Sequence, residues 1–219
     1  LVSHMFGVPG DVARYAAAGV PVVENLDGSI GASVNGNPAG SLGDFSILHF
    51  NDQAMITTGN GGMLASKDRE KGRLIQSFKN DPARVDYLMS DFNASLGISQ
   101  MHKLKKNIET RRTIGRYFDE AVHGSSGTLV GRDEGREPAY CGYTVKTRTP
   151  FEECQRFFKR SGIPVQKGLP QPLHALMGLD VREFPVAEEM CNTLIALPIY
   201  PGLGREEIEG ITKSIRAVL

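Results

Sequence analysis

One short polar run carries several of the side chains that could do chemistry. His49, Asn51, Asp52 and Gln53 lie close together, just before the glycine-rich run Gly59-Asn60-Gly61-Gly62. Imidazole, amide and carboxylate groups can exchange protons and hydrogen bonds with a small polar ligand. They can equally bond to one another and to water in a polar hollow. The sequence leaves both interpretations open.

The cysteines are a second place to look for chemistry, but their spacing argues against it. Cys141, Cys154 and Cys191 lie far apart, with no CxxC pair and no nearby pair of histidines. A zinc site or a disulfide framework needs closer or more regular spacing. We therefore expect buried thiols.

The remaining titratable groups have ordinary structural interpretations beside any functional one. Asp44 is expected to cap or stabilise the turn before the strand that follows it. The basic run from Lys103 to Arg112 is typical of a solvated helix face. No motif surrounds the other histidines that lie far from the polar run, which are His4, His102 and His123.

Composition bounds the class of protein. The chain has 219 residues, of which 40% are hydrophobic and 23% charged, as in ordinary globular proteins. Lys plus Arg and Asp plus Glu each total 25, so the net charge of zero gives no reason to expect nucleic acid or an anionic membrane as partner. No apolar run approaches the roughly 20 residues that span a bilayer. We expect a cytoplasmic, enzyme-like protein.

The elements that must position these residues begin with a layered first half. We expect a helix over residues 11–18, begun by Asp11 and ended by Gly19, followed by a strand over residues 21–24. Further apolar runs at residues 45–50 and 63–66 read as strands. Short apolar strands separated by helical or loop segments predict an α/β fold with a mostly parallel sheet covered on both faces.

The second half has a different pattern. Apolar residues recur at helical spacing over residues 94–122, which predicts one long helix. A polar loop is expected over residues 124–138. A smaller α+β unit should follow, with a strand at 140–147, helices at 151–161, 184–194 and 205–218, and an extended segment at 197–201.

Three ordered stretches carry a family resemblance. The first runs from Pro21 to Ala32 and is similar to V-I-E-D-A-A-[HQ]-[AS]-L-G-A. The second runs from Gly40 to Gly62 and is similar to G-S-F-G-D, a strand, S-F-H-x-x-K-N and T-T-G-E-G-G. The third, Tyr87 to Ala94, is similar to N-Y-R-M-S-E-x-Q-A. Together they resemble the DegT/DnrJ/EryC1/StrS family of pyridoxal-phosphate sugar aminotransferases.

The C-terminal part agrees with this resemblance, which therefore covers essentially the whole chain. Matching segments occur in the family's order at Ser161-Gly162-Ile163, Pro172-Leu173-His174, 184–189 and 197–203. The resemblance implies an incomplete fold-type-I aminotransferase large domain over residues 1–120, including the linking helix, and a small C-terminal domain over residues 121–219.

The family's first portion, with its early strands and phosphate-binding turn, has no counterpart in this sequence. A parallel sheet without those strands would expose unpaired backbone and apolar surface. We expect that portion to lie outside the sequence shown, to have been removed, or to be supplied by another chain. A complete protein of 219 residues is the alternative.

The resemblance also maps the cofactor site onto this chain, and nearly every mapped position has changed. The lysine that would form the Schiff base corresponds to Ala54, and its register is set by Asp44 before it and by Gly59 and Gly61 after it. By the same resemblance, Asn25 replaces the carboxylate that pairs with the pyridine nitrogen, Gly28 replaces the residue that packs on the ring, and His49 replaces a phosphate-binding serine. Asp86 replaces an asparagine that reaches the phosphate from a neighbouring subunit, and Leu88 replaces the arginine beside it.

These changes remove what pyridoxal phosphate needs from a protein. An alanine methyl cannot form a Schiff base or move a proton, and an amide at Asn25 brings no negative charge to the pyridine nitrogen. Gly28 offers no side chain, and the charge of Asp86 would repel a phosphate. Lys79 and Lys167 lie outside the matching segment. His174 lies near the pocket in relatives, where a structural role fits it equally well.

Two hypotheses of different class follow. In the first, the chain is a catalytically degenerate family member that does not depend on pyridoxal phosphate. It would then act as a scaffold, partner or regulator in sugar modification, as a homodimer or a heterodimer with a related chain. In the second, it is an active transferase or dehydratase-type enzyme that acts on keto-sugar nucleotides through a non-standard site. A sugar nucleotide is a possible ligand under either hypothesis.

Overall fold

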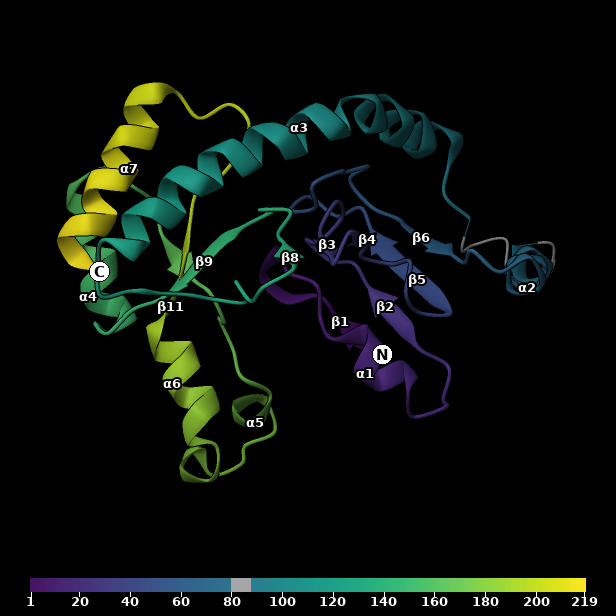
Figure 1. Cartoon of the computed structure of the whole chain (residues 1–219), viewed down its shortest axis with the longest axis horizontal. Coiled ribbons are helices and arrows are strands. Elements are labelled where there is room, and N and C mark those ends of the chain that lie inside the picture. Colours follow the sequence, from purple (N-terminus) through teal and green to yellow (C-terminus); the bar gives the residue numbers. More distant parts are fainter. Residues whose placement is uncertain (80–87) are drawn as a thin grey trace. The chain divides into compact units, whose positions relative to one another are not determined.

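The computed structural model describes residues 1–79 and 88–219 of the chain (Figure 1). The chain forms two compact units. The first comprises Leu1–Glu109 and Arg132–Cys141, and the second comprises Thr110–Gly131 and Gly142–Leu219. The domain boundary that the sequence predicts between residues 120 and 121 stays a prediction.

The first unit is built on a mixed sheet whose strand order is β1-β2-β5-β6. The pairs β1–β2 and β2–β5 are parallel, whereas β6 is antiparallel to β5 (Figure 1). This confirms the mostly parallel α/β sheet expected from the apolar runs. The strands are β1 (Val2–Ser3), β2 (Val23–Asn25), β5 (Phe45–His49) and β6 (Gly62–Ala65).

The other elements of this unit connect and flank the sheet. Asp11 caps the first helix as predicted, because its carboxylate accepts from the Arg14 backbone N–H at 3.2 Å. The helix over residues 69–79 was not predicted from the sequence. The elements are η1 (Met5–Gly7), α1 (Val12–Ala16), α2 (Arg69–Lys79), the start of α3 (Asp91–His123), and a small antiparallel sheet of β4 (Asn37–Pro38), β3 (Ser33–Val34) and β8 (Arg136–Glu137).

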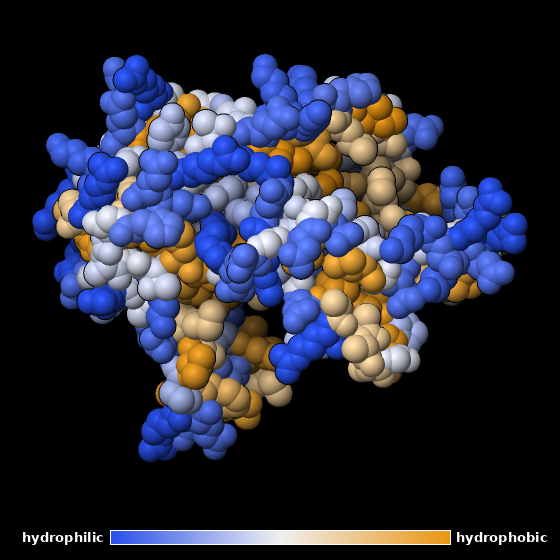
Figure 2. Space-filling model, in the orientation of Figure 1, coloured by the Kyte–Doolittle hydropathy of each residue, from blue (hydrophilic) through white to orange (hydrophobic). Residues whose placement is uncertain are grey.

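Apolar side chains are exposed along one edge of this unit. Met63 and Leu64 of β6 are 45% and 44% exposed, and Phe92 and Ile98 of α3 are 80% and 58% exposed. Figure 2 shows apolar atoms at the surface over the first half of α3.

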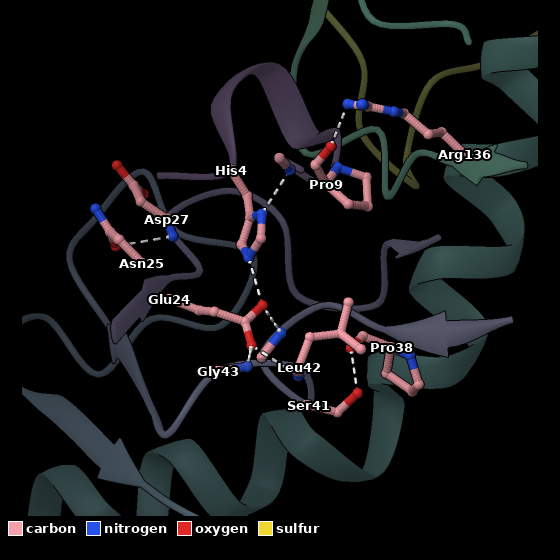
Figure 3. Close-up of polar contacts among 12 residues, drawn as sticks. His4, Pro9, Glu24, Asn25, Asp27, Pro38, Ser41, Leu42, Gly43 and Arg136 are labelled. Atoms are coloured by element: carbon pink, nitrogen blue, oxygen red, sulfur yellow. Dashed lines mark hydrogen bonds and ion pairs between the residues drawn. The ribbon is translucent and has the colours of Figure 1, made fainter. Parts of the chain in front are cut away.

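The most fully buried charge of the first unit is the Glu24 carboxylate on β2, whose residue is 0% exposed. It accepts from His4 Nε2 at 2.8 Å and from the backbone N–H groups of Gly40, Leu42 and Gly43 (Figure 3). Burial alone would raise the pKa of Glu24, but these hydrogen bonds outweigh it and lower the pKa from 4.5 to about 2. Through these hydrogen bonds, Glu24 holds the segment after β1 and the loop before β5 against strand β2.

Gly43 shows how tightly that loop is packed. A Cβ at position 43 would lie 2.9 Å from the Val22 carbonyl oxygen and 3.0 Å from Glu24 Cγ. The loop can approach β2 closely enough to donate to Glu24 only because this residue has no side chain.

Asp44, expected to stabilise the turn before β5, does so by joining three segments. Its backbone N–H donates to the Val22 carbonyl at 2.8 Å, and its carboxylate accepts from Val22 N at 2.7 Å. Lys71 of α2 forms an ion pair with the same carboxylate and, together with the Val22 hydrogen bond, lowers the pKa of Asp44. The amino ends of β2 and β5 are thereby held together.

The second unit is an antiparallel sheet flanked by helices, as the predicted α+β pattern requires. Phe118 of α3 packs edge-on against Tyr143, with ring centroids 5.2 Å apart, and both are 0% exposed. The sheet order is β10 (Gln166–Lys167), β11 (Leu194–Leu197), β9 (Tyr143–Lys146) and β7 (Thr128–Leu129). The remaining elements are α4 (Phe151–Arg160), α5 (Leu173–Leu176), η3 (Val181–Glu183), α6 (Pro185–Thr193) and α7 (Arg205–Val218).

One sequence-based assignment is wrong and one strand was not predicted. The predicted loop over residues 124–138 contains the short strands β7 and β8. The helix predicted over residues 184–194 is present as α6, but the apolar residues that follow it form the buried strand β11 between β9 and β10. A short apolar run after a helix has no periodicity that separates further helix from a buried strand, so only the pairing partner decides.

Replacing Glu24 by Gln should destabilise the first unit. The amide would place N–H donors against backbone N–H donors, and we expect a loss of roughly 2–4 kcal/mol in the free energy of unfolding. Urea unfolding, with hydrogen exchange of the β5 amides as a local probe, measures it. Glu134→Gln, at an exposed position of the same unit, is the matched control and should change stability by less than about 0.5 kcal/mol. Equal effects of the two variants would contradict the assigned role.

The low pKa of Glu24 predicts a specific acid sensitivity. Because the folded-state pKa lies at about 2 and the ordinary value is 4.5, Glu24 stabilises the fold fully above pH 4.5. That contribution, about 3 kcal/mol, is lost as the pH falls from 4.5 toward 2. Urea midpoints measured across this window should fall more steeply for the natural protein and Glu134→Gln than for Glu24→Gln. Parallel profiles would exclude Glu24 as the source.

Candidate functional site

The carboxyl ends of β2 and β5 bring together two of the mapped positions. Asn25 ends β2 and His49 ends β5, and the parallel register pairs Asn25 with Ile47. Because side chains alternate along a strand, Asn25, Ile47 and His49 lie on one face of the sheet. The opposite face holds Glu24 and the buried Ser46.

His49 has a charged partner in the turn that follows β2. Its Nε2 lies 3.1 Å from Asp27 Oδ1, and the two side chains are 36% and 57% exposed. The Asp27 backbone N–H in turn donates to Asn25 Oδ1 at 3.2 Å (Figure 3). Asn25, Asp27 and His49 thus form a connected polar group, which we call the strand-end triad.

Gly28 follows directly in the same turn. Its φ of +67° is in the left-handed region that favours glycine. A Cβ at this position would lie 3.6 Å from Cys141 Cβ and Sγ, which is ordinary contact. The position is therefore not crowded, but its backbone conformation disfavours the side chain that the resemblance implies.

Ala54 lies in the loop that joins β5 to β6. The loop turns at Asn51, whose carbonyl accepts from Ala54 N at 3.3 Å. It is anchored by Gln100 of α3, whose side chain accepts from Thr57 N at 3.2 Å and donates to the Thr57 carbonyl. Ala54 thus presents a methyl group from an anchored loop.

The rest of the polar run mainly shapes this loop. Asn51 Oδ1 accepts from Gln53 N at 3.1 Å, and Asn51, Asp52 and Gln53 are exposed. Among residues 1–79 and 88–219, no hydrogen bond or ion pair joins the side chains of these three residues to the strand-end triad. Among the described residues of this run, only His49 pairs through its side chain with a residue outside the loop, Asp27 in the turn after β2.

The last two mapped positions lie elsewhere. Asp86 is outside the described residues. Leu88 lines a groove of about 750 Å³ together with Ile47 and Leu64 of the sheet and with Phe78 of α2. Among its described lining residues, which are mostly apolar, Lys79 is the one that could pair with a phosphate.

The candidates of the second unit are structural in their contacts. His174 is 4% exposed, bonds to Glu188 Oε1 at 2.7 Å and stacks on Phe184 at 4.6 Å between ring centroids. Lys167 pairs with Glu152 at 3.5 Å and lies over the ring of Phe151.

The expected burial of the cysteines is confirmed for two of the three. Cys154 and Cys191 are buried, Cys141 is partly buried, and all three are free thiols. Burial raises the pKa of the Cys154 and Cys191 thiols, so both resist ionisation. No cluster of three or more His, Cys, Asp or Glu side chains suited to a metal ion occurs among the described residues. None of the described helices is long and apolar enough to cross a membrane.

Sequence reasoning missed two residues. His4, which stood apart from any motif, is 2% exposed and bonds to Glu24, while its Nδ1 accepts from Gly10 N at 2.8 Å. Asp27 was passed over although it lies two residues after Asn25. That spacing, at the end of a strand, is the signal that could have placed it beside His49.

Comparison with known proteins identifies the family of this chain. The sequence model of the DegT/DnrJ/EryC1/StrS aminotransferase family matches residues 1–216. The chain belongs to this family.

Individual relatives agree with the family assignment. GDP-perosamine synthase of Caulobacter vibrioides is 32% identical over 90% of this chain and 58% of its own length. A pleiotropic regulatory protein of Geobacillus stearothermophilus is 27% identical over 97% of this chain and 63% of its own length. The chain therefore spans about three fifths of the length of these relatives.

A solved structure supports the fold. The aminotransferase TlmJ of Streptoalloteichus hindustanus superposes with a TM-score of 0.81 at 23% identity, over 99% of this chain and 64% of that chain. The fold is thus that of the fold-type-I pyridoxal-phosphate aminotransferases, as the ordered motifs predicted.

Gln100 should control the mobility of the loop that carries Ala54. In Gln100→Ala both bonds to Thr57 are lost, and we expect the amides of Thr57 and Thr58 to exchange with solvent roughly tenfold faster. Hydrogen exchange detected by mass spectrometry or NMR measures this change. Gln155→Ala, at an exposed position of α4, is the control and should leave these amides unchanged. Unchanged exchange in Gln100→Ala would show that other contacts hold the loop.

Proposed function

We propose that this chain is a family member that does not carry out transamination through covalently held pyridoxal phosphate. Its role would be that of a scaffold, partner or regulator in a sugar-modifying pathway. The observation that carries the proposal is Ala54, which presents a methyl group where the resemblance places the lysine. A methyl group can neither bond to the cofactor nor carry a proton.

The strand-end triad adds to this argument. At Asn25 a neutral amide stands where a carboxylate would keep a pyridine nitrogen protonated, and its Oδ1 is already used by Asp27 N. His49, at the mapped phosphate position, is paired with the Asp27 carboxylate. These side chains do not fit pyridoxal phosphate as a covalently held, electron-accepting group.

Two nearby lysines do not replace the missing one. Lys67 donates to the Ser41 carbonyl at 2.5 Å, and Lys71 pairs with Asp44. Ser41 and Asp44 precede β5, so both lysines are engaged at the amino end of that strand, whereas the triad lies at its carboxyl end.

The relatives suggest a context. The names of relatives include both a sugar-nucleotide enzyme, GDP-perosamine synthase, and a regulatory protein. A regulator or an inactive partner that pairs with itself or with a related chain fits a member whose fold is kept and whose mapped site is altered at several positions. The competing hypothesis, an active enzyme on keto-sugar nucleotides, requires a lysine elsewhere or chemistry of another kind.

Covalent trapping tests the proposal. The purified protein is mixed with pyridoxal phosphate, reduced with borohydride and digested, and lysine adducts are mapped by mass spectrometry. We expect no site-specific adduct and no saturable absorbance band from a bound cofactor. A stoichiometric adduct on one lysine of this chain would overturn the proposal and favour the enzyme hypothesis.

Ala54→Lys is the matched variant for the same experiment. Because Asn25, Gly28 and His49 remain changed, restoring the amine alone should leave amino transfer to keto-sugar nucleotides at background. Measurable turnover by Ala54→Lys would show that the other positions still support the chemistry.

A further inference from the structure

A cavity of about 550 Å³ lies between α4 and α7, within the second unit (Figure 1). Its volume is in the range of roughly 300–1,000 Å³ that is usual for small-molecule sites. None of its described lining residues belongs to the strand-end triad or to the other mapped positions. A ligand in this cavity is therefore independent of whether the chain holds pyridoxal phosphate.

Most of the cavity wall is apolar. Ile163 and Ile211 are 8% and 2% exposed and form a buried part of the wall, to which Phe157 and Leu203 add further apolar groups. Tyr200, which also lines the cavity, is 43% exposed, so the cavity reaches solvent there. An aryl or alkyl group of a ligand would be removed from water in this interior.

One polar group in the wall has no partner. Ser214 is 7% exposed, and its hydroxyl makes no hydrogen bond within the described part of the chain. A hydroxyl in a helix can bond to the carbonyl four residues earlier, as Thr212 of the same helix does to Ile208 O at 2.7 Å. Buried polar groups without a partner are uncommon in proteins. The Ser214 hydroxyl is therefore available to a ligand in the cavity.

Lys213 adds a positive charge beside this hydroxyl. It lines the cavity, and its ammonium group has no ion pair or hydrogen bond among the residues that the structure describes. The carboxylates of the lining lie farther along α7, because Glu206 precedes Lys213 by roughly 10 Å of helix. Glu207 is already engaged, since it accepts from Gly204 N at 2.8 Å. The end of the cavity at Ser214 is thus the positive end.

These groups select a class of ligand. A carboxylate has one negative charge and two acceptor oxygens, which match one ammonium group and one hydroxyl donor. A phosphate carries nearly two negative charges and three acceptor oxygens, so it would need further donors. An amine would be repelled by Lys213 and attracted to Glu206, away from the Ser214 hydroxyl.

We propose that this cavity binds a small carboxylic acid with an apolar body. The carboxylate accepts from Ser214 Oγ and Lys213 Nζ, and the apolar body packs against Phe157, Ile163 and Leu203. The inference goes beyond the proposed function, because it assigns a ligand to the second unit.

Three probes with the same apolar body and different head groups test the inference: phenylbutyrate, phenylbutanol and phenylbutylamine. Binding is followed by NMR through the δ1-methyl signal of Ile163, which is assigned by its loss in Ile163→Val. We expect a saturable shift with phenylbutyrate, and dissociation constants roughly fivefold higher or more for the other two probes.

Two variants remove the partners of the carboxylate. Lys213→Gln and Ser214→Ala should each raise the dissociation constant for phenylbutyrate roughly three- to tenfold. Ser214→Ala leaves no other group unsatisfied, so the urea midpoint should stay unchanged. Lys159→Gln, at an exposed position of α4 outside the cavity lining, is the matched control and should bind as the natural protein does.

Gly210 allows the cavity to be filled without disturbing the fold. It lines the cavity, and a Cβ at this position would meet no atom within 4 Å. Gly210→Leu should therefore place a side chain in the cavity and abolish binding, while helix propensity favours the substitution. Gly72→Leu, at an equally open helical position in α2, is its control and should leave binding unchanged.

Several results would overturn the inference. These are no saturable shift of the Ile163 signal with phenylbutyrate, equally tight binding of either other probe, unchanged binding by Lys213→Gln and Ser214→Ala, or normal binding by Gly210→Leu. A borohydride-stable lysine adduct would contradict only the proposed function, whether or not the cavity binds phenylbutyrate.

Discussion

The buried carboxylate of Glu24 is the interaction on which the first unit depends. Removing a carboxylate from water is costly unless hydrogen bonds to the charged form offset the loss of solvation. Here His4 and three backbone N–H groups of the loop at residues 40–43 supply those bonds. Because the donors come from segments on both sides of β2 in the sequence, one charged group fixes β1, β2 and the entry to β5 relative to one another.

That constraint also decides what faces solvent. Neighbouring residues of a strand point to opposite faces, so a buried Glu24 turns Asn25 outward. The register with β5 then brings Asn25 to the same face as His49, and the turn after β2 adds Asp27. The amino ends of the same strands are held by Asp44, Val22 and Lys71. The charged groups that hold the sheet together thus lie within it and at the amino ends of its strands, and the strand-end triad lies at the carboxyl ends.

The site departs from the resemblance in a coherent way. The mapped residues Asn25 and His49 are not isolated from each other, because both contact Asp27. An altered lysine position alone would leave a pocket suited to the cofactor. The Asn25 amide and the paired His49 ring also give this face of the sheet a different charge and different hydrogen-bond donors from those that the resemblance implies.

Several parts of the fold could be predicted because their causes are local. Asp11 begins α1, which ends at Ala16 before the predicted stop at Gly19. Helical spacing predicted α3, and apolar runs predicted β2, β5 and β6. The strands β7, β8 and β11 were missed because a short strand exists only through its partner. Two of these strands are two residues long, and β11 is an apolar run that local pattern cannot tell from helix.

The sequence by itself determined the family, the fold class and the identity of the residue at each mapped position, since ordered motifs and residue types are properties of the chain. Only the tertiary structure decided which of those residues meet. His4 and Glu24 are 20 positions apart, and Asp27 and His49 belong to different strand ends. Their pairing depends on strand register and on which face is buried, and both are set by the packing of the whole unit.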